Sequence, residues 1–383
     1  MKYELKDNLM TLFFEGELSS KNNLDVQLDI EKTLEGKSFS SLVLDFEKLN
    51  YISSAGLRVI LKLKQAYKEV EVINCSLEVY DVFEMTGFTD MMSIKKALKK
   101  VDVSKAEVVG EGFFSTVYRI DKDTIIKVFN RTSDSKQIER ELKLAKQAFV
   151  LGIPTAISFD IVKVGEKLGV RFEMLDCDSL KSMVQKHPEK MDHFLKKYVE
   201  LLKTITTTEC DDPNIPDIKK FYLEKVEVIK PYLDEDHYKK AKKIVENIKD
   251  SSTFVHGDCH FKNIMVQGEE LLLIDMDTLS VGNPIFEFAQ IYAPYVAFDE
   301  DDPGNIERFF GIKKSDGVAL FNSLVEHYYN CKDQVVKDKI ALVAYIHMVW
   351  WNRINEPSNE VRLKGCRSRL YSLLDRYDDV NIK

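Results

Sequence analysis

The sequence predicts an α/β domain followed by a larger α+β domain, in which a strand-rich part precedes a helical part. Three observations support this. Strand-like and helix-like segments alternate over the first ~100 residues, which is typical of an α/β layer structure. The polar segment 99–105 then interrupts the pattern, as linkers between domains do. From about Asn305 onward, apolar residues recur at three- and four-residue spacing, which indicates amphipathic helices.

Composition excludes several classes of protein. The chain has 383 residues, 44% of them hydrophobic, and a net charge of −8, which argues against a general nucleic-acid surface. Its six cysteines form no CxxC pair and no metal-binding spacing, so we expect reduced thiols. No apolar run approaches the ~20 residues that span a bilayer. The charged N-terminus lacks the apolar core of a signal peptide. We therefore expect a cytoplasmic protein without nucleic-acid or membrane partners.

The first domain, residues 1–102, contains short apolar runs that indicate strands and periodic segments that indicate helices. The predicted strands are 10–15, 42–46 and 70–73, and the predicted helices begin near Leu24, Ser53 and Ser76. Ser53 and Ser54 stand before an apolar pattern, where hydroxyl side chains cap helices. Gly87 is suited to closing the last of these helices.

Three segments of this domain, 42–46, 50–59 and 79–88, resemble in order those of a STAS domain, the fold of anti-sigma-factor antagonists. The resemblance covers roughly residues 1–100 and implies a protein partner. In the phosphorylatable members the helix begins Asp-Ser-Ser/Thr-Gly, and the serine after the aspartate accepts phosphate.

Aligned on Gly56, Ser54 occupies that acceptor position, although Ser53 replaces the aspartate and Ala55 the second hydroxyl. A phosphate on Ser54 would lie at the start of a helix, where free N–H groups favour anions. The alternative is that Ser53 or Ser54 only caps the helix. Both interpretations stay open from the sequence.

A glycine-rich turn lies near the start of the second domain, residues 103–383. The segment 109–118 reads Val-Gly-Glu-Gly-Phe-Phe-Ser-Thr-Val-Tyr and resembles the hairpin that covers nucleotide phosphates in the kinase fold. Gly110 and Gly112 would let the backbone approach the phosphates, and Val117 would pack on the adenine. Ser115 stands where protein kinases often have a third glycine, and we expect it to contact the nucleotide as well. Since any tight hairpin can use two glycines, the later motifs decide the interpretation.

Lys127 interrupts the apolar strand that follows. A lysine there is costly unless it meets a charged partner, and an ATP phosphate together with a carboxylate would serve. The next predicted helix, 135–149, offers Glu139 and Glu141, and we favour Glu141 because it adjoins the apolar side of that helix. The alternative is an edge-strand lysine that reaches water.

The stretch His256-Gly257-Asp258-Cys259-His260-Phe261-Lys262-Asn263 supplies a carboxylate and, five residues later, an amide. Asp275 follows a second apolar run, and a hairpin would return it to Asn263. Phosphoryl transfer from a nucleotide needs one carboxylate to orient the attacking hydroxyl, and an amide oxygen with a second carboxylate to hold Mg²⁺. The sequence therefore predicts one site containing Asp258, Asn263 and Asp275. Asp277 is either a further metal or substrate contact or a turn residue.

These motifs resemble those of aminoglycoside phosphotransferases and choline kinases, a branch of the kinase-like fold. The resemblance covers roughly residues 104–383 and is strongest at 109–128 and 254–290. It implies a bilobal protein-kinase-like domain, with a small lobe of about 103–175 and a large lobe of about 176–383. It also implies ATP and Mg²⁺ as cofactors.

The same resemblance assigns roles to single residues. Asp258 would be the base or orienter of the acceptor hydroxyl, and Asn263 and Asp275 would be metal ligands. The main chains of Glu173 and Leu175 would bind the adenine edge. The segment Gly282-Asn283-Pro284 also fits the family pattern, although an aspartate is commoner at the position of Glu287.

The acceptor implied by this family is a small hydroxyl-bearing molecule. The acidic run 299–302, with the aromatic residues Tyr345, Trp350 and Trp351, would receive a cationic group through carboxylates and ring faces. The alternative is that the aromatic residues belong to the core and that the acidic run is solvated.

Three functions fit the sequence. The first is an ATP- and Mg²⁺-dependent phosphotransferase that acts on a hydroxyl of a small molecule and carries a STAS regulatory module. The second is a signalling protein kinase whose acceptor is Ser54, in the same or another chain. The third is a non-catalytic nucleotide-binding scaffold. Lys127, Asp258, Asn263 and Asp275 together argue against the third, because a scaffold needs no complete catalytic set.

Overall fold

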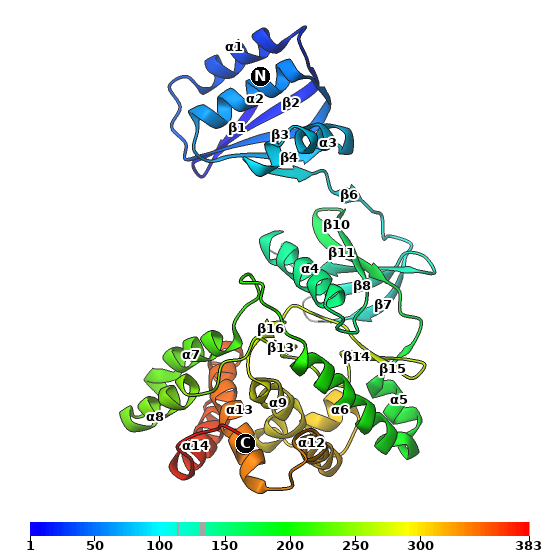
Figure 1. The fold of residues 1–383 in the computed structure, drawn as a ribbon, viewed down its shortest axis with the longest axis vertical. Helices are drawn as coiled ribbons and strands as arrows, with labels where there is room; N and C mark the ends of the chain where they lie inside the picture. The colour runs from blue at the N-terminus through cyan, green and yellow to red at the C-terminus, as the bar shows by residue number, and fades with distance from the viewer. Residues whose placement is uncertain (113–114, 131–134, 383) are drawn as a thin grey trace. The chain divides into compact units, whose positions relative to one another are not determined.

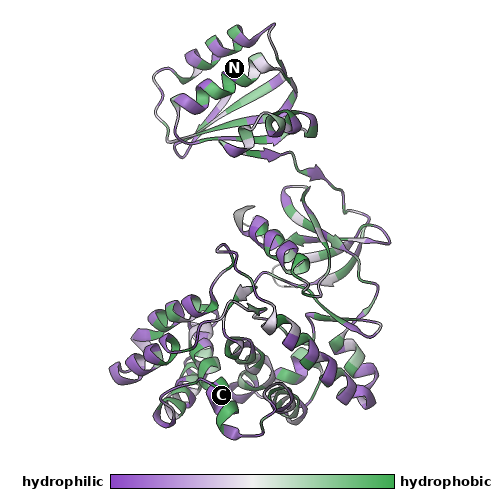
Figure 2. Cartoon of the chain, in the orientation of Figure 1, coloured by the Kyte–Doolittle hydropathy of each residue, from purple (hydrophilic) through white to green (hydrophobic). Residues whose placement is uncertain are grey.

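The predicted fold class is confirmed by the computed structural model, which describes residues 1–112, 115–130 and 135–382. Two units are distinguished, Met1–Val101 and Asp102–Lys383. The first is an α/β unit, and the second has a strand-rich part followed by a helical part (Figure 1). Figure 2 shows that the helices carry both hydrophobic and hydrophilic residues, as expected for helices with one face on a core.

The first unit contains a five-stranded sheet of order β1–β2–β3–β4–β5. Its first two strands are antiparallel, whereas β2, β3, β4 and β5 are parallel neighbours. Its elements are β1 (Lys2–Lys6), β2 (Leu9–Leu18), α1 (Asn23–Leu34), β3 (Ser41–Ile52), α2 (Ser54–Ala66), β4 (Val70–Cys75), α3 (Leu77–Met85), the 3₁₀ turn η1 (Phe88–Asp90), β5 (Ser93–Lys96) and β6 (Lys99–Lys100).

One apolar core joins this sheet to its helices, because the central strands bury alternate residues such as Met10, Leu12 and Phe14. Two local features fix the start of α2 against β2. Ser53 caps it by accepting the N–H of Gly56, and a Cβ on Gly56 would lie 2.8 Å from Leu18 Cγ and close to the Leu18 carbonyl oxygen. The helix therefore approaches β2 at a position where only glycine fits.

The strand-rich part of the second unit has β10, β11, β9, β8 and β7 side by side in that order. These strands pair antiparallel, and the helix α4 packs against β10 and β11. The elements are β7 (Glu107–Glu111), β8 (Ser115–Arg119), β9 (Thr124–Phe129), α4 (Ser135–Val150), β10 (Ser158–Val164) and β11 (Lys167–Glu173).

The helical part is interrupted by two small sheets, the three-stranded β12–β14–β15 and the two-stranded β13–β16, which flank the segments predicted to be catalytic. Its elements are β12 (Asp178–Ser179), α5 (Leu180–Lys186), η2 (Pro188–Lys190), α6 (Met191–Thr207), α7 (Ile218–Ile229), η3 (Lys230–Tyr232), α8 (Glu235–Glu246), β13 (Phe254–Val255), β14 (Ile264–Gln267), β15 (Glu270–Leu273), β16 (Ser280–Val281), α9 (Pro284–Tyr292), the π-helical η4 (Ala293–Ala297), α10 (Phe298–Asp301), α11 (Asn305–Phe310), α12 (Lys314–Tyr329), α13 (Gln334–Asn355) and α14 (Glu360–Arg376).

Helix α13 is central to this part, since it contacts α7, α9 and α14 and buries residues on several of its faces (Figure 1). Helices that are apolar on more than one face are typical of the interior of a larger domain. Across the three described ranges, no helix is both long and apolar enough to cross a membrane.

Replacing Gly56 with alanine should destabilise the first unit by about 1–3 kcal/mol, because the added methyl group overpacks against Leu18 and Ile52. Urea unfolding of the full chain followed by circular dichroism would show an earlier transition. Tryptophan fluorescence would stay unchanged, because Trp350 and Trp351, the only tryptophans in the sequence, lie in the second unit.

The matched control is Ser54→Ala, which alters an exposed side chain two residues earlier in the same turn and should change stability by less than ~0.5 kcal/mol. Equal stability of the two variants would contradict the close approach inferred at Gly56.

Candidate active site

Lys127 lies in the middle of β9, between Val117 on β8 and Val170 on β11. Its Nζ lies 2.7 Å from Glu141 Oε1 and 2.8 Å from Asp275 Oδ1, and 15% of its side chain is exposed. Burial alone would lower the pKa of Lys127, but the carboxylates of Asp275 and Glu141 outweigh burial and raise it. The ammonium therefore stays charged and joins three separate segments of the chain.

Glu141 is the glutamate of α4 that the sequence favoured as the partner of Lys127, and the structure pairs the two. It is only 6% exposed. Burial raises the pKa of the Glu141 carboxyl, while Lys127 opposes that rise. A carboxylate this deeply buried is tolerated because the ammonium accompanies it.

The loop after β13 is held by hydrogen bonds to buried groups. The N–H groups of His256 and Gly257 donate to Glu287 Oε2 at 2.5 and 3.2 Å. The Asp258 N–H donates to His256 Nδ1 at 3.2 Å, and His256 Nε2 lies 3.3 Å from the Ile274 carbonyl oxygen. Burial lowers the pKa of His256 to about 4, so the ring is neutral. These partners place its proton on Nε2, from which it donates to Ile274.

Glu287 was noted in the sequence only as a departure from the family pattern, and its part in this loop was missed. It is fully buried on α9, and burial raises the pKa of its carboxyl to about 7. A signal was present, because a glutamate in the apolar run Ile285–Ala289 needs a buried partner. Gly257 completes the loop at a φ of +81°, a conformation that favours glycine.

Asp258 and Asn263 lie together, as predicted from their spacing. Asn263 Nδ2 donates to Asp258 Oδ2 at 2.8 Å and to the Asp258 carbonyl oxygen at 3.1 Å. Asp275 also acts on Asp258 through its charge. Burial raises the pKa of the Asp258 carboxyl, and the negative charges of Asp275 and Asp277 add to this effect, so that the pKa is about 8. Asp275 itself has a φ of +69°, which is uncommon outside glycine and is often found at functional sites.

A divalent cation fits this donor set. Because Asn263 donates with its amide nitrogen, its amide oxygen remains a hard ligand, as does the Asp275 carboxylate oxygen that does not face Lys127. The carboxylates around Asp258 supply negative charge that a cation would balance. Among the described residues, no three His, Cys, Asp or Glu side chains form a metal cluster. A cation would therefore depend on one or two protein oxygens plus phosphate, which is typical of Mg²⁺.

The glycine-rich hairpin forms between β7 and β8. Gly110 pairs with Val117, and the Gly112 N–H donates to the Ser115 carbonyl oxygen at 2.9 Å. A Cβ on Gly110 or Gly112 would make only ordinary contacts of 3.5 and 3.6 Å, so the hairpin itself does not require these glycines. Bare backbone at this place instead leaves room for another molecule. Phe113 and Phe114, at the centre of the predicted motif, lie outside the described residues.

The predicted adenine connector follows β11. The Glu173 N–H donates to Ile157 O at 2.9 Å, so this amide is already occupied. Leu175 is buried with Ala156 and Leu272 in a small apolar cluster, against which Met265 and Ile274 also pack. The cluster lies beside the connector and contains apolar residues that the sequence did not single out.

A cavity of about 650 Å³ opens beside the loop after β13, residues 256–263, which we call the catalytic loop for its predicted role. Gly257 lines it from the loop after β13, and Asp277 and Thr278 line it from the segment between β15 and β16. Helices α7 and α13 contribute Lys225, His347 and Trp350. Asp277 therefore lines a cavity, whereas Asp275 pairs with Lys127. Lys225 was missed by the sequence, although it lies on the apolar face of α7, three residues after Tyr222.

The carboxylates of the acidic run 299–302, which the sequence offered as a receptor for a cationic acceptor, have cationic partners within the protein. The ion pairs are Asp299 with Lys314, Glu300 and Asp301 with Arg369, and Asp302 with Arg308 and Arg362. Tyr345 donates to Glu300, and Trp351 packs edge-on against Phe298. Of the three predicted aromatic residues, Trp350 lines the cavity.

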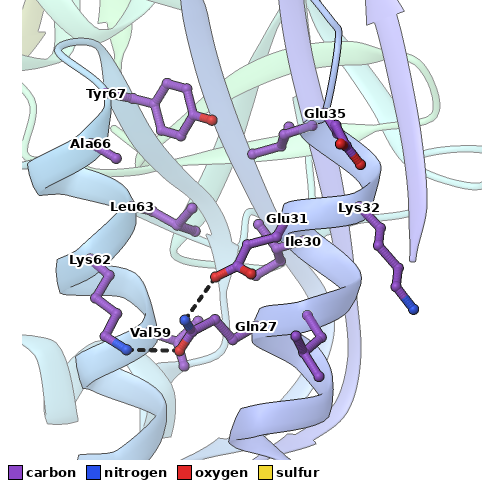
Figure 3. Close-up of a pocket in the computed structure, with 12 residues that line it drawn as sticks. Gln27, Ile30, Glu31, Lys32, Glu35, Val59, Lys62, Leu63, Ala66 and Tyr67 are labelled. Carbon is purple, nitrogen blue, oxygen red and sulfur yellow. Dashed lines mark hydrogen bonds between the residues drawn. The ribbon is translucent and has the colours of Figure 1, made fainter.

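In the first unit, Ser54 is the exposed first residue of α2, and the cap is supplied by Ser53 Oγ, 3.5 Å from the Gly56 nitrogen. A separate recess of about 560 Å³ lies between α1 and α2 (Figure 3). Gln27 bridges its two sides by donating to Glu31 and accepting from Lys62, each at 2.8 Å. Three polar side chains of this recess, those of Gln27, Glu31 and Lys62, are thus joined by hydrogen bonds.

Comparison with known proteins gives two matches along the chain. Residues 1–101 match the STAS domain, and residues 105–312 match the phosphotransferase enzyme family. The protein named "Putative anti-sigma factor antagonist BtrV" of Bordetella bronchiseptica is 32% identical over 92 residues, which cover 23% of this chain and 78% of that protein.

Solved structures similar to this chain include the gentamicin complex of APH(2")-IIa, with 15% identity, a TM-score of 0.47 and coverage of 76% of this chain and 95% of that chain. A choline/ethanolamine kinase family protein from Mesorhizobium loti has 10% identity, a TM-score of 0.47 and coverage of 71% and 88%.

Lys127→Met should destabilise the second unit by about 3–5 kcal/mol, because it leaves the buried Glu141 carboxylate without its cation. The double variant Lys127→Met/Glu141→Leu should recover most of that loss, since it removes both charges. Urea unfolding followed by tryptophan fluorescence would measure both values. Additive losses in the double variant would show that the two side chains are not energetically coupled.

The match to residues 105–312 covers more than half of the chain, and the same residues contain the lysine–glutamate pair, the catalytic loop and the acid that follows it. The chain therefore belongs to the phosphotransferase enzyme family and carries a STAS domain ahead of its phosphotransferase domain.

Proposed function

We propose that the second unit transfers the γ-phosphoryl group of ATP to a hydroxyl of a small molecule, with Mg²⁺ as the required cation. The observation that carries this proposal is the contact of Lys127 with both Glu141 and Asp275. This contact brings the Lys127 ammonium, on the strand-rich part, to the carboxylate of Asp275, which follows the β14–β15 hairpin. Phosphoryl transfer is catalysed largely by positioning and electrostatic stabilisation, which such a fixed charge provides.

The nucleotide would lie between the glycine-rich hairpin and the apolar cluster beside the connector. Backbone at Gly110, Gly112 and Ser115 would approach the phosphates, and Val117 would pack on the base. The carbonyl of Glu173 and the amide of Leu175 would bind the adenine edge. This assignment respects the hydrogen bond that the Glu173 N–H already makes to Ile157.

Asp258 would accept the hydroxyl proton as the acceptor oxygen forms a bond to the γ-phosphorus. The bond from that phosphorus to the β,γ-bridging oxygen breaks, and ADP leaves with the electron pair. Asn263 would keep Asp258 in position through the hydrogen bond from Nδ2. Asn263 and Asp275, with Asp277 as a further candidate, would hold Mg²⁺, which supplies charge stabilisation to the phosphates when bound.

Asp258→Asn should lower turnover by roughly 10²–10⁴-fold, since the amide cannot accept the proton. ADP release would be measured with Mg-ATP over a panel of hydroxylated acceptors. Asp378→Asn, which changes a 95% exposed carboxylate, is the matched control. Full activity of the Asp258 variant would refute the assignment. Binding of a nucleotide analogue without turnover across the whole panel would favour the scaffold.

A second candidate function is phosphorylation of Ser54 by the same kinase site, in the same or another chain. The observation in its favour is that Ser53 supplies the cap of α2, which leaves the exposed Ser54 hydroxyl unnecessary for capping. A phosphate there would lie at the start of a helix and add nearly two negative charges to a docking surface.

Intact-mass analysis after incubation with Mg-ATP and no acceptor tests this candidate. The wild type should gain one phosphate, and both Ser54→Ala and Asp258→Asn should prevent the gain. Ser53→Ala is the control, since it removes the cap but keeps the acceptor. Absence of phosphate on the wild type, or its presence on Ser54→Ala, would count against this role.

A further inference from the structure

The cavity beside the catalytic loop contains a buried lysine that the proposed chemistry does not use. Lys225 lies on α7 and is 1% exposed. Its Nζ lies 2.8 Å from His347 Nδ1, and 4.3, 4.2 and 4.8 Å from the ring centroids of Phe221, Tyr222 and Trp350. Among the described residues, the partners that Nζ meets are this imidazole and these rings, and none is a carboxylate.

A buried ammonium without a carboxylate is costly. Lys127, the other deeply buried lysine of this site, has two carboxylates, whereas Lys225 has none at its nitrogen. Burial lowers the pKa of Lys225 to about 7, and the imidazole of His347 is kept neutral by burial and by Lys225. Cation–π contacts offset only part of the desolvation. Lys225 therefore has unused capacity to bind an anion.

The remaining charged groups of the cavity do not neutralise Lys225. Arg140, Lys220 and Glu224 are exposed at its edge. Asp217 accepts hydrogen bonds from N–H groups at the start of α7 and pairs with Lys220 at 3.9 Å. Asp277 lies on the side of the catalytic loop, where a metal ion would balance it.

We propose that the acceptor carries an anionic group, a carboxylate or a phosphate, that binds Lys225 while its hydroxyl lies at the catalytic loop. This inference rests on the proposed phosphotransferase function and names the class of its acceptor. Lys225, Gly257 of the loop after β13 and Asp277 after β15 line the same cavity, so one small molecule in it can reach both Lys225 and this loop. Its volume, about 650 Å³, is within the usual range for small-molecule sites.

The rings around Lys225 fit this arrangement. Phe221 is 42% exposed, and exposed side chains change rotamer rapidly, so its ring can turn aside and open the ammonium to the cavity. Trp350 packs edge-on against Phe221 and also lines the cavity. Apolar ring surfaces beside a single charge exclude water and strengthen a charge-assisted hydrogen bond.

The first test is direct anion binding, measured by calorimetry on the full chain with the nucleotide site saturated by Mg²⁺ and a non-hydrolysable ATP analogue. The probes are inorganic phosphate and acetate, which represent the two anion classes. At least one probe should bind the wild type, and Lys225→Met should weaken binding at least ~10-fold. Lys239→Met, a change at an exposed lysine outside the cavity, should bind like the wild type.

Thermal unfolding and binding of the ATP analogue separate this role from a structural one. Lys225→Met should keep or raise the Tm, because an unpaired buried charge is replaced by an apolar side chain of similar length. If Lys225→Met binds both anions like the wild type, or if the wild type binds neither, the proposal is overturned. These readouts do not depend on turnover, so they hold whether or not phosphotransfer is observed.

The second test compares matched acceptors on the unchanged protein. Hydroxy acids and sugar phosphates are paired with the corresponding hydroxy amides, amino alcohols and uncharged sugars, and ADP release is measured. Turnover confined to anionic members supports the proposal. Turnover confined to cationic members refutes it but leaves the phosphotransferase function standing. If no compound is turned over although phosphate or acetate binds through Lys225, the result counts against the proposed phosphotransferase function instead.

Discussion

The ion pairs of the Lys127 ammonium are the interaction on which the arrangement of the candidate site depends. The ammonium contacts Glu141 on α4 and Asp275 after β15, so one buried charge links the strand-rich and helical parts of the second unit. The buried Glu141 carboxylate would be costly at its position without this cation, and the cation would be costly in β9 without a carboxylate partner. The ion pairs of Lys127 therefore hold together three segments that are distant in the chain.

A second set of buried polar groups keeps the loop around Asp258 in shape. Glu287 receives two backbone N–H groups, and the neutral His256 ring bridges the Asp258 amide and the Ile274 carbonyl. Each of these bonds satisfies a group that would be costly to bury alone. The loop is thus preorganised by hydrogen bonding inside the protein, which leaves the Asp258 carboxylate to be positioned by Asn263.

The sequence predicted well where chemistry constrains residue type and spacing together. Lys127 with Glu141, and Asp258 with Asn263, were placed together because a charge in an apolar strand and a carboxylate five residues from an amide both demand partners. The edge strands β1 and β5 of the first sheet were not foreseen, because their residues are exposed or half-buried and form no apolar run. Lys225 was missed because its environment is assembled from α7 and α13, which are far apart in the chain.

The charged groups around the cavity beside α7 show that a count of charges in the sequence does not predict the charge that lines a cavity. The acidic run 299–302 suggested a cationic acceptor, yet each of its members is neutralised by a lysine or arginine of the same unit. Exposed and paired charges contribute little to a site, because water and counter-charges screen them. Lys225, in contrast, lines the cavity with its nitrogen buried against His347 and aromatic rings and without a carboxylate of any described residue at hydrogen-bonding distance. The absence of a counter-charge, more than the net charge of −8, therefore determines which charge a ligand meets.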